Sequence, residues 1–91
     1  MNKNYEDAIQ LWMTLAKEGD AHAQFNLGLM YLYGNGVIKD IVEACAWLNI
    51  SVAQGNEVAH IDRDSIQKEL TPSQLLKALE LSQVYYYKYV K

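Results

Sequence analysis

Residues 23–40 read AQFNLGLMYLYGNGVIKD, an apolar segment followed by a Gly-Asn-Gly turn and, four residues later, by an aspartate. Glycine is common where helices end because it adopts the left-handed conformation without strain. A second apolar segment follows Asp40 and ends at Gly55. The pattern predicts a helical hairpin with helices over about residues 21–33 and 41–53, the second of them capped by Asp40 with Glu43 completing a capping box.

The segments flanking this hairpin repeat parts of it at an offset of 36 residues. Gly19 and Gly55 are separated by this offset, and so are Ala8 and Ala44. Similar residues also recur at the same spacing, in the pairs Asn4 and Asp40, Asp7 and Glu43, Leu11 and Trp47, Ala16 and Val52, and Asp20 and Asn56. A period of this size is typical of stacked helical hairpins, in which each hairpin contacts only its neighbours.

Two further helices are predicted on either side of the hairpin. The first covers about residues 5–18, with Asn4 as its N-cap and acidic residues in its first turn, where the helix dipole favours them. The other covers about residues 57–70 and is more polar.

The clearest helix start in the chain is Thr71-Pro72-Ser73-Gln74, which combines a capping threonine, a proline at the first helical position and a glutamine that closes a capping box. A fifth helix therefore runs from Pro72 to near the C-terminus. The tyrosine-rich run over residues 85–90 has high β-propensity, but we interpret it as the end of this helix, with one face packed on the fourth helix. The chain is thus predicted to be all-α, with about five helices in a single domain over residues 1–91.

Gly28 lies inside the second predicted helix, where glycine costs roughly 1 kcal/mol relative to alanine. A close approach by a neighbouring helix would compensate for that cost. The helical period predicts a core made of Ala8, Leu11, Ala23, Leu27, Gly28, Tyr31, Ala44, Trp47, Leu48 and Val52.

Composition excludes several classes of protein. The chain is 51% hydrophobic, which is too apolar for a disordered chain. A net charge of −3 and a single arginine, Arg63, argue against nucleic-acid binding. No apolar run approaches the roughly 18 residues of a membrane span. One cysteine, Cys45, permits no intramolecular disulfide and is expected in the core, and a reducing, cytoplasmic location fits best.

The sequence resembles the Sel1-like repeat family, whose members are α-solenoids of helical hairpins similar to tetratricopeptide repeats. The matching residues are Ala23, Leu27, Gly28, Tyr31, Gly34, Gly36, Val37, Asp40, Ala44, Trp47, Gln54 and Gly55. The resemblance implies a half repeat over residues 4–19, one complete repeat over residues 20–55, and a degenerate helix plus a C-terminal capping helix over residues 56–91. Arg63 and Asp64 replace the Leu-Gly pair in the degenerate helix, so no further full repeat is expected to stack there.

The resemblance also implies a non-catalytic adaptor or scaffold that binds another protein through the exposed side of its second helix. An exposed aromatic run is typical of an interface, so the C-terminal tyrosines are candidate contacts as well and favour a homodimer. The candidate partner-binding residues are His22, Gln24, Asn26, Leu29, Tyr33, Tyr85, Tyr86 and Tyr89.

Other interpretations stay open. The chain could be a homo-oligomerising capping fragment of a larger repeat protein, and Met1 could begin a very short member or a piece of a longer array. A small hydrolase related to cysteine-rich Sel1-like proteins is the remaining alternative, although those carry paired cysteines. No cofactor or catalytic residue is expected. No metal site is expected either, because His60, Asp62 and Asp64 alternate along a helix and the three cannot converge on one ion.

Overall fold

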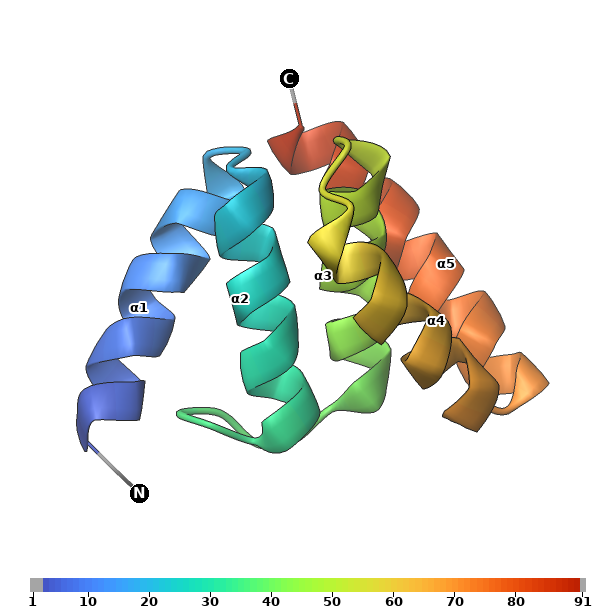
Figure 1. Cartoon of the computed structure of the whole chain (residues 1–91), viewed down its shortest axis with the longest axis horizontal. Helices are drawn as coiled ribbons and strands as arrows, with labels where there is room; N and C mark the ends of the chain where they lie inside the picture. The colour runs from blue at the N-terminus through green and yellow to red at the C-terminus, as the bar shows by residue number, and fades with distance from the viewer. Residues whose placement is uncertain (1–2, 91) are drawn as a thin grey trace.

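Five α-helices form the chain in the computed structural model, which describes residues 3–90 (Figure 1). Their bounds are α1 Lys3–Lys17, α2 Ala21–Tyr33, α3 Ile41–Ala53, α4 Val58–Glu69 and α5 Pro72–Tyr89. No strand occurs within residues 3–90, so the all-α prediction is confirmed.

The α2–α3 hairpin has the predicted bounds because its ends are determined locally. Asp20 caps α2 by accepting a hydrogen bond from the backbone N–H of Ala23, and Gly34 ends it with φ 70°. Asp40 caps α3 by accepting from the N–H groups of Val42 and Glu43, at 3.1 Å each. The predicted capping box at Asp40 is wrong, since the carboxylate of Glu43 is turned instead toward a tyrosine of α5.

The remaining helix ends agree with prediction except at α1. This helix begins at Lys3, so Asn4 lies within it and the prediction of Asn4 as an N-cap is wrong. The capping box of α5 is confirmed, because Thr71 Oγ1 accepts from the N–H of Gln74 and Gln74 Oε1 accepts from the N–H of Thr71. The tyrosine-rich run is helical to Tyr89, also as predicted.

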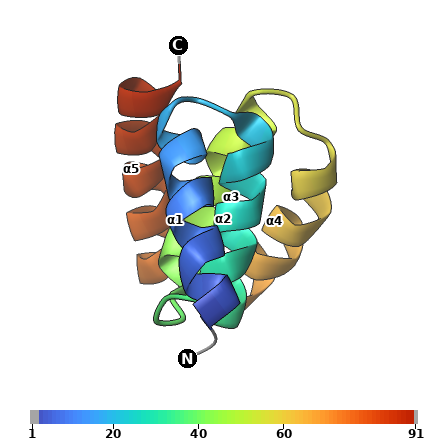
Figure 2. The same ribbon diagram turned by 90° about the vertical axis from the view of Figure 1, so that its left-hand side faces the viewer.

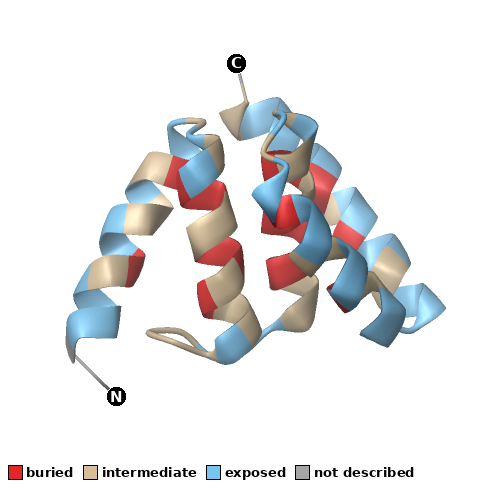
Figure 3. Ribbon diagram, viewed as in Figure 1, coloured by how far each residue is buried: buried red, intermediate tan, exposed pale blue. Residues whose placement is uncertain are grey.

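The core is centred on α3, which packs against α2, α4 and α5. Figure 3 shows the buried residues concentrated on α3 and along α2, which lies between α1 and α3. A Cβ on Gly28 would lie 2.9 Å from the Leu48 Cγ and 3.2 Å from the Ala44 carbonyl oxygen. The predicted close approach of two helices at Gly28 is therefore confirmed, and Cys45 is buried in the core as expected.

The C-terminal helix does not form a hairpin with α4. It packs on α3 and reaches α1, while among the described residues it makes at most marginal contact with α4. Figure 2 shows α4 and α5 at opposite edges of the molecule, with α1, α2 and α3 between them. The expectation that the tyrosine run packs on the fourth helix is thus wrong.

One predicted core residue is on the surface. Leu11 is 56% exposed, whereas Ile9, which the prediction left out, is only 2% exposed. Either Leu11 or Ile9 fits the helical period of a core residue, because the apolar residues of α1 cover a broad part of its surface. The side that faces α2 is the one that is buried, and Leu11 lies on another side.

Candidate functional site

The residues predicted on α2 do not form one accessible surface. His22 and Tyr33 are exposed, while Asn26 and Leu29 are half-buried. The ring of His22 lies edge-on to that of Trp12, with 6.1 Å between the centroids. These four residues remain candidate contacts with a partner.

Gln24 is wrong as a partner contact, because its side chain is 0% exposed. Its Nε2 donates to the carbonyl oxygen of Ala16 at 3.0 Å, and its Oε1 accepts from Gln54 Nε2 at 2.6 Å. Buried polar groups of this kind are retained where every donor and acceptor finds a partner. Gln24 thus links α1, α2 and the end of α3 inside the chain.

Two of the predicted tyrosines pack within the chain. Tyr85 and Tyr89 both stack on Trp47, with centroid distances of 4.4 Å and 5.8 Å. The Tyr85 hydroxyl donates to both carboxylate oxygens of Glu43, at 2.8 Å and 3.0 Å. Desolvation, followed by this hydrogen bond and the negative charge of Glu43, raises the pKa of Tyr85 well above its usual range. These contacts hold α5 on α3 and leave each of the two tyrosines only partly exposed.

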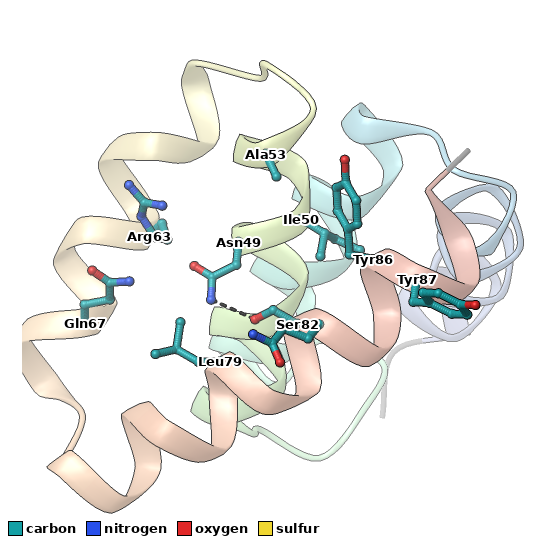
Figure 4. A pocket seen from close by; sticks show the side chains of 10 residues that line it. Asn49, Ile50, Ala53, Arg63, Gln67, Leu79, Ser82, Tyr86 and Tyr87 are labelled. Carbon is teal, nitrogen blue, oxygen red and sulfur yellow. Dashed lines mark hydrogen bonds between the residues drawn. The ribbon is translucent and has the colours of Figure 1, made fainter.

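Tyr86 differs from its neighbours, because it is 46% exposed and borders a groove with a volume of about 450 Å³ (Figure 4). The groove lies between α4 and α5, with α3 as its floor. Its lining residues are Asn49, Ile50, Ala53, Arg63, Gln67, Leu79, Ser82, Gln83, Tyr86 and Tyr87.

The groove combines an apolar lining with amide and hydroxyl groups. Leu79 extends from α5 toward the space over α3, and Gln67 extends toward the same space from α4 (Figure 4). On the floor, Asn49 Nδ2 donates to the Ser82 hydroxyl at 2.9 Å, which joins α3 to α5. Arg63 is the one cationic residue of the lining, and its Nε donates to Asp64 Oδ1 at 3.0 Å.

Sequence analysis identified Tyr86 but missed most of this groove. The groove exists because α5 leaves α4 and crosses α3, so its lining comes from three helices at unrelated spacings. One indication was present in the sequence. The polar pair Arg63-Asp64, which replaces Leu-Gly, already predicted that α4 is not packed like α2.

The ionisable residues of α4 form an exposed cluster beside the groove. His60 Nδ1 lies 3.1 Å from Asp64 Oδ2, and both side chains are about half exposed. Although desolvation alone would raise it, hydrogen bonds from Arg63 and His60 hold the pKa of Asp64 below its usual range. Within residues 3–90 no group of three or more His, Cys, Asp or Glu side chains could hold a metal ion. Neither His60 nor Asp64 lines the groove.

Comparison with known families now identifies the central hairpin. Residues 21–56 match the family model of the Sel1 repeat. This segment is a Sel1 repeat. The match covers α2, the turn and α3, so the resemblance predicted from the sequence of the hairpin is confirmed.

A solved structure extends the likeness beyond the Sel1 repeat. The crystal structure of a protective antigen present in uropathogenic Escherichia coli strains, which displays an SLR fold, superposes with a TM-score of 0.92 at 34% sequence identity. The likeness covers 99% of this chain, including α5, but only 20% of that protein. A comparison with curated proteins found no significant match. Of the helices in residues 3–90, none combines the length and hydropathy that crossing a bilayer requires.

The Sel1 repeat supplies only the floor of the groove. Asn49, Ile50 and Ala53 belong to it, whereas the two walls come from α4 and α5, which follow it in the chain. The groove is therefore a feature of how the C-terminal helices pack against the repeat.

Proposed function

We propose that this chain is a non-catalytic protein-interaction module that binds a short segment of another protein in the groove between α4 and α5. The observation that carries the proposal is the groove itself, which has a volume of about 450 Å³ and is lined by apolar and polar side chains from three helices. Clefts of this size, mostly apolar with a few convergent polar groups, are where proteins usually bind their ligands. The presence of a Sel1 repeat and the SLR fold of the solved neighbour support a binding role.

The lining favours an apolar side chain flanked by peptide groups. Ala53 and Leu79 offer an apolar surface for that side chain, beside the buried Ile50. Amide side chains such as Gln67 and Gln83 can donate to and accept from the backbone of a bound segment. Tyr86 adds a large, half-exposed ring of the kind that dominates binding energy at protein interfaces.

A peptide-display selection against the immobilised chain tests this proposal. We expect enriched peptides to share an apolar anchor residue and to bind the chain in solution. Leu79→Glu should weaken that binding by about tenfold or more, because it places a charge beside the anchor. Tyr86→Ala should weaken it to a similar extent, by removing contact area.

Leu76→Glu is the matched control, because Leu76 is exposed on the same helix but does not line the groove. It should leave the affinity unchanged. Circular dichroism of all three variants would establish that they fold alike. Enriched peptides that bind Leu79→Glu and Tyr86→Ala as tightly as the parent chain would rule out the groove as the binding site.

The homodimer through the tyrosine-rich helix stays a prediction. With Tyr85 and Tyr89 stacked on Trp47, the most accessible tyrosines of α5 are Tyr86 and Tyr87. Light scattering over a concentration series, with Tyr87→Ser as the comparison, would detect such a dimer. Cytoplasmic location and a scaffold role likewise remain predictions.

A further inference from the structure

The groove between α4 and α5 carries a charge opposite to that of the chain as a whole. Eleven acidic and eight basic residues give the chain a net charge of −3. The lining of the groove, however, contains no aspartate or glutamate and a single cation, Arg63. A ligand that enters the groove therefore meets a positive charge on the α4 wall, and complementary charge is a common source of specificity in binding.

Arg63 is held in place by its neighbours on α4. Its Nε donates to Asp64 Oδ1 at 3.0 Å, and its Nη2 lies 3.2 Å from His60 Nδ1. The Arg63 side chain is 21% exposed, whereas those of His60 and Asp64 are about half exposed and do not line the groove. Among the described residues nothing accepts a hydrogen bond from Arg63 Nη1, which carries two N–H donors. The guanidinium is thus oriented by its neighbours and keeps donors for a ligand.

No other group of the lining selects for charge. The Ser82 hydroxyl accepts from Asn49 Nδ2 and donates to a backbone carbonyl oxygen of α5 at 2.5 Å, so its proton is already used. The amides of Gln67 and Gln83 donate as well as accept, and so they do not distinguish a carboxylate from the corresponding amide. The charge preference of the groove therefore depends on Arg63.

We propose that Arg63 makes the groove selective for segments in which an aspartate or glutamate stands next to the apolar anchor. This inference rests on the function proposed above and adds the chemistry of the ligand. Leu79 and Arg63 lie on opposite walls of the groove, on α5 and α4 (Figure 4). Successive side chains of an extended segment point to opposite sides, so a residue adjacent to an anchor at Leu79 points toward Arg63. A carboxylate at that position accepts a charge-assisted hydrogen bond from Arg63 Nη1.

The carboxylate is that of a side chain and not the C-terminus of the partner. Arg63 and Gln67 are about one helical turn apart and together form the α4 wall, so a segment that runs along this wall meets both. An acidic side chain reaches Arg63 from such a segment wherever the segment lies in the partner. A terminal carboxylate would require the segment to end beside Arg63.

Pools of short amidated peptides, applied to the immobilised chain, test the proposal. Each pool has a central leucine, isoleucine or phenylalanine, flanked on both sides by Asp or Glu, by Asn or Gln, or by Lys, and all other positions are randomised. We expect the acidic pool to be retained about fivefold more than the amide pool at low salt, and the lysine pool to be retained least. This preference should shrink as salt is added, because salt screens the charges.

Variants of α4 locate the preference. Arg63→Gln should abolish it, and adding Asp64→Asn to that variant should not restore it, which excludes repulsion by an unpaired Asp64 as the cause. Lys68→Gln is the matched control and should keep the preference, because Lys68 is exposed on the same helix, does not line the groove and loses the same charge. A merely structural role of Arg63 would lower the retention of the acidic and amide pools alike and leave their ratio unchanged.

Tyr86→Ala separates this proposal from the one on which it rests. Equal retention of the three amidated pools by the parent chain, above their retention by Tyr86→Ala, would overturn the role of Arg63 and leave the peptide groove in place. Retention of no pool above the level of Tyr86→Ala would overturn both proposals. A preference that persists in Arg63→Gln, or that Lys68→Gln also removes, would overturn the role of Arg63. So would an amide pool with a free C-terminus that is retained as well as the acidic pool, since Arg63 would then bind a terminal carboxylate.

Discussion

Replacing Gly28 by alanine has two opposing effects on stability, and their balance depends on the distance between α2 and α3. Alanine favours a helix interior over glycine by about 0.8–1.0 kcal/mol. Its Cβ would lie 2.9 Å and 3.0 Å from Cγ and Cδ2 of Leu48 and 3.2 Å from the Ala44 carbonyl oxygen. Carbon atoms in favourable contact are about 3.5–4.0 Å apart, so the added carbon overlaps its neighbours.

Overpacking of this degree costs about 1–3 kcal/mol. Subtracting the gain in helix propensity leaves a net loss of about 1 kcal/mol for Gly28→Ala. In a chain of this size, that loss lowers the Tm by about 4–8 °C. Gly28→Leu adds three more carbons to the same space and should cost about 3 kcal/mol or more.

Urea unfolding followed by circular dichroism measures these differences. Lys77 is exposed within α5, so comparing Lys77→Ala with Lys77→Gly measures the propensity term in this chain alone. Leu48→Ala removes the flexible part of the obstruction but not the Ala44 carbonyl. In that background, the destabilisation by Gly28→Ala should be smaller than in the parent chain, because only the Ala44 carbonyl oxygen still crowds the added Cβ.

A stabilisation by Gly28→Ala equal to the difference measured at Lys77 would refute the close approach. So would an unchanged Tm in Gly28→Leu. Either result would mean that α2 and α3 separate without cost.

The other predictions concern single hydrogen bonds. Tyr85→Phe should lower the free energy of unfolding by about 1.5 kcal/mol, because it leaves the Glu43 carboxylate without its donor, whereas Tyr87→Phe should change little because Tyr87 is 91% exposed. Since the pKa of Tyr85 is raised in the fold, its contribution is complete below about pH 10 and is lost at higher pH, so the decline of stability with rising alkaline pH should be smaller in Tyr85→Phe. Thr71→Ala should cost about 1 kcal/mol by removing the α5 cap, measured by the same unfolding assay. Gln24→Ala should cost about 1–3 kcal/mol by leaving buried partners unsatisfied, and unaltered stability would contradict its buried position.

The α2–α3 hairpin could be predicted from the sequence because its determinants are local. Gly34 ends one helix and Asp40 begins the next, and each acts on the backbone within a few residues of itself. Gly28 then predicted close packing, because the lower helix propensity of an interior glycine is compensated where a neighbouring helix approaches its backbone closely. The repeat offset extended this reasoning to α1 and α4 without any knowledge of their contacts.

Burial on α1 could not be predicted in the same way. The apolar stripe that includes Leu11 matches the face that α3 uses against α2, so the sequence pattern was that of a repeat in contact with a preceding helix. Within residues 3–90 no such helix is present, and the buried residues of α1 are those on the side toward α2. Leu11 was therefore predicted in the core because the sequence pattern does not indicate which side of α1 meets α2.

The groove depends on which side of α5 packs against α3, and the sequence of α5 alone does not determine that side. Tyrosines at 85, 86, 87 and 89 point in several directions, so periodicity favours no particular side for packing. The side is determined by two groups distant in sequence, Trp47, on which two of the rings stack, and Glu43, which accepts from the Tyr85 hydroxyl. Once α5 is held there it cannot also cover α4, and the space between them becomes the groove. The contacts that hold α5 on α3 thus also create the candidate binding site. Tyr85→Phe should therefore weaken the binding of groove peptides only indirectly, by letting α5 shift on α3. Tyr86→Ala should weaken the same binding directly, without a comparable loss of stability.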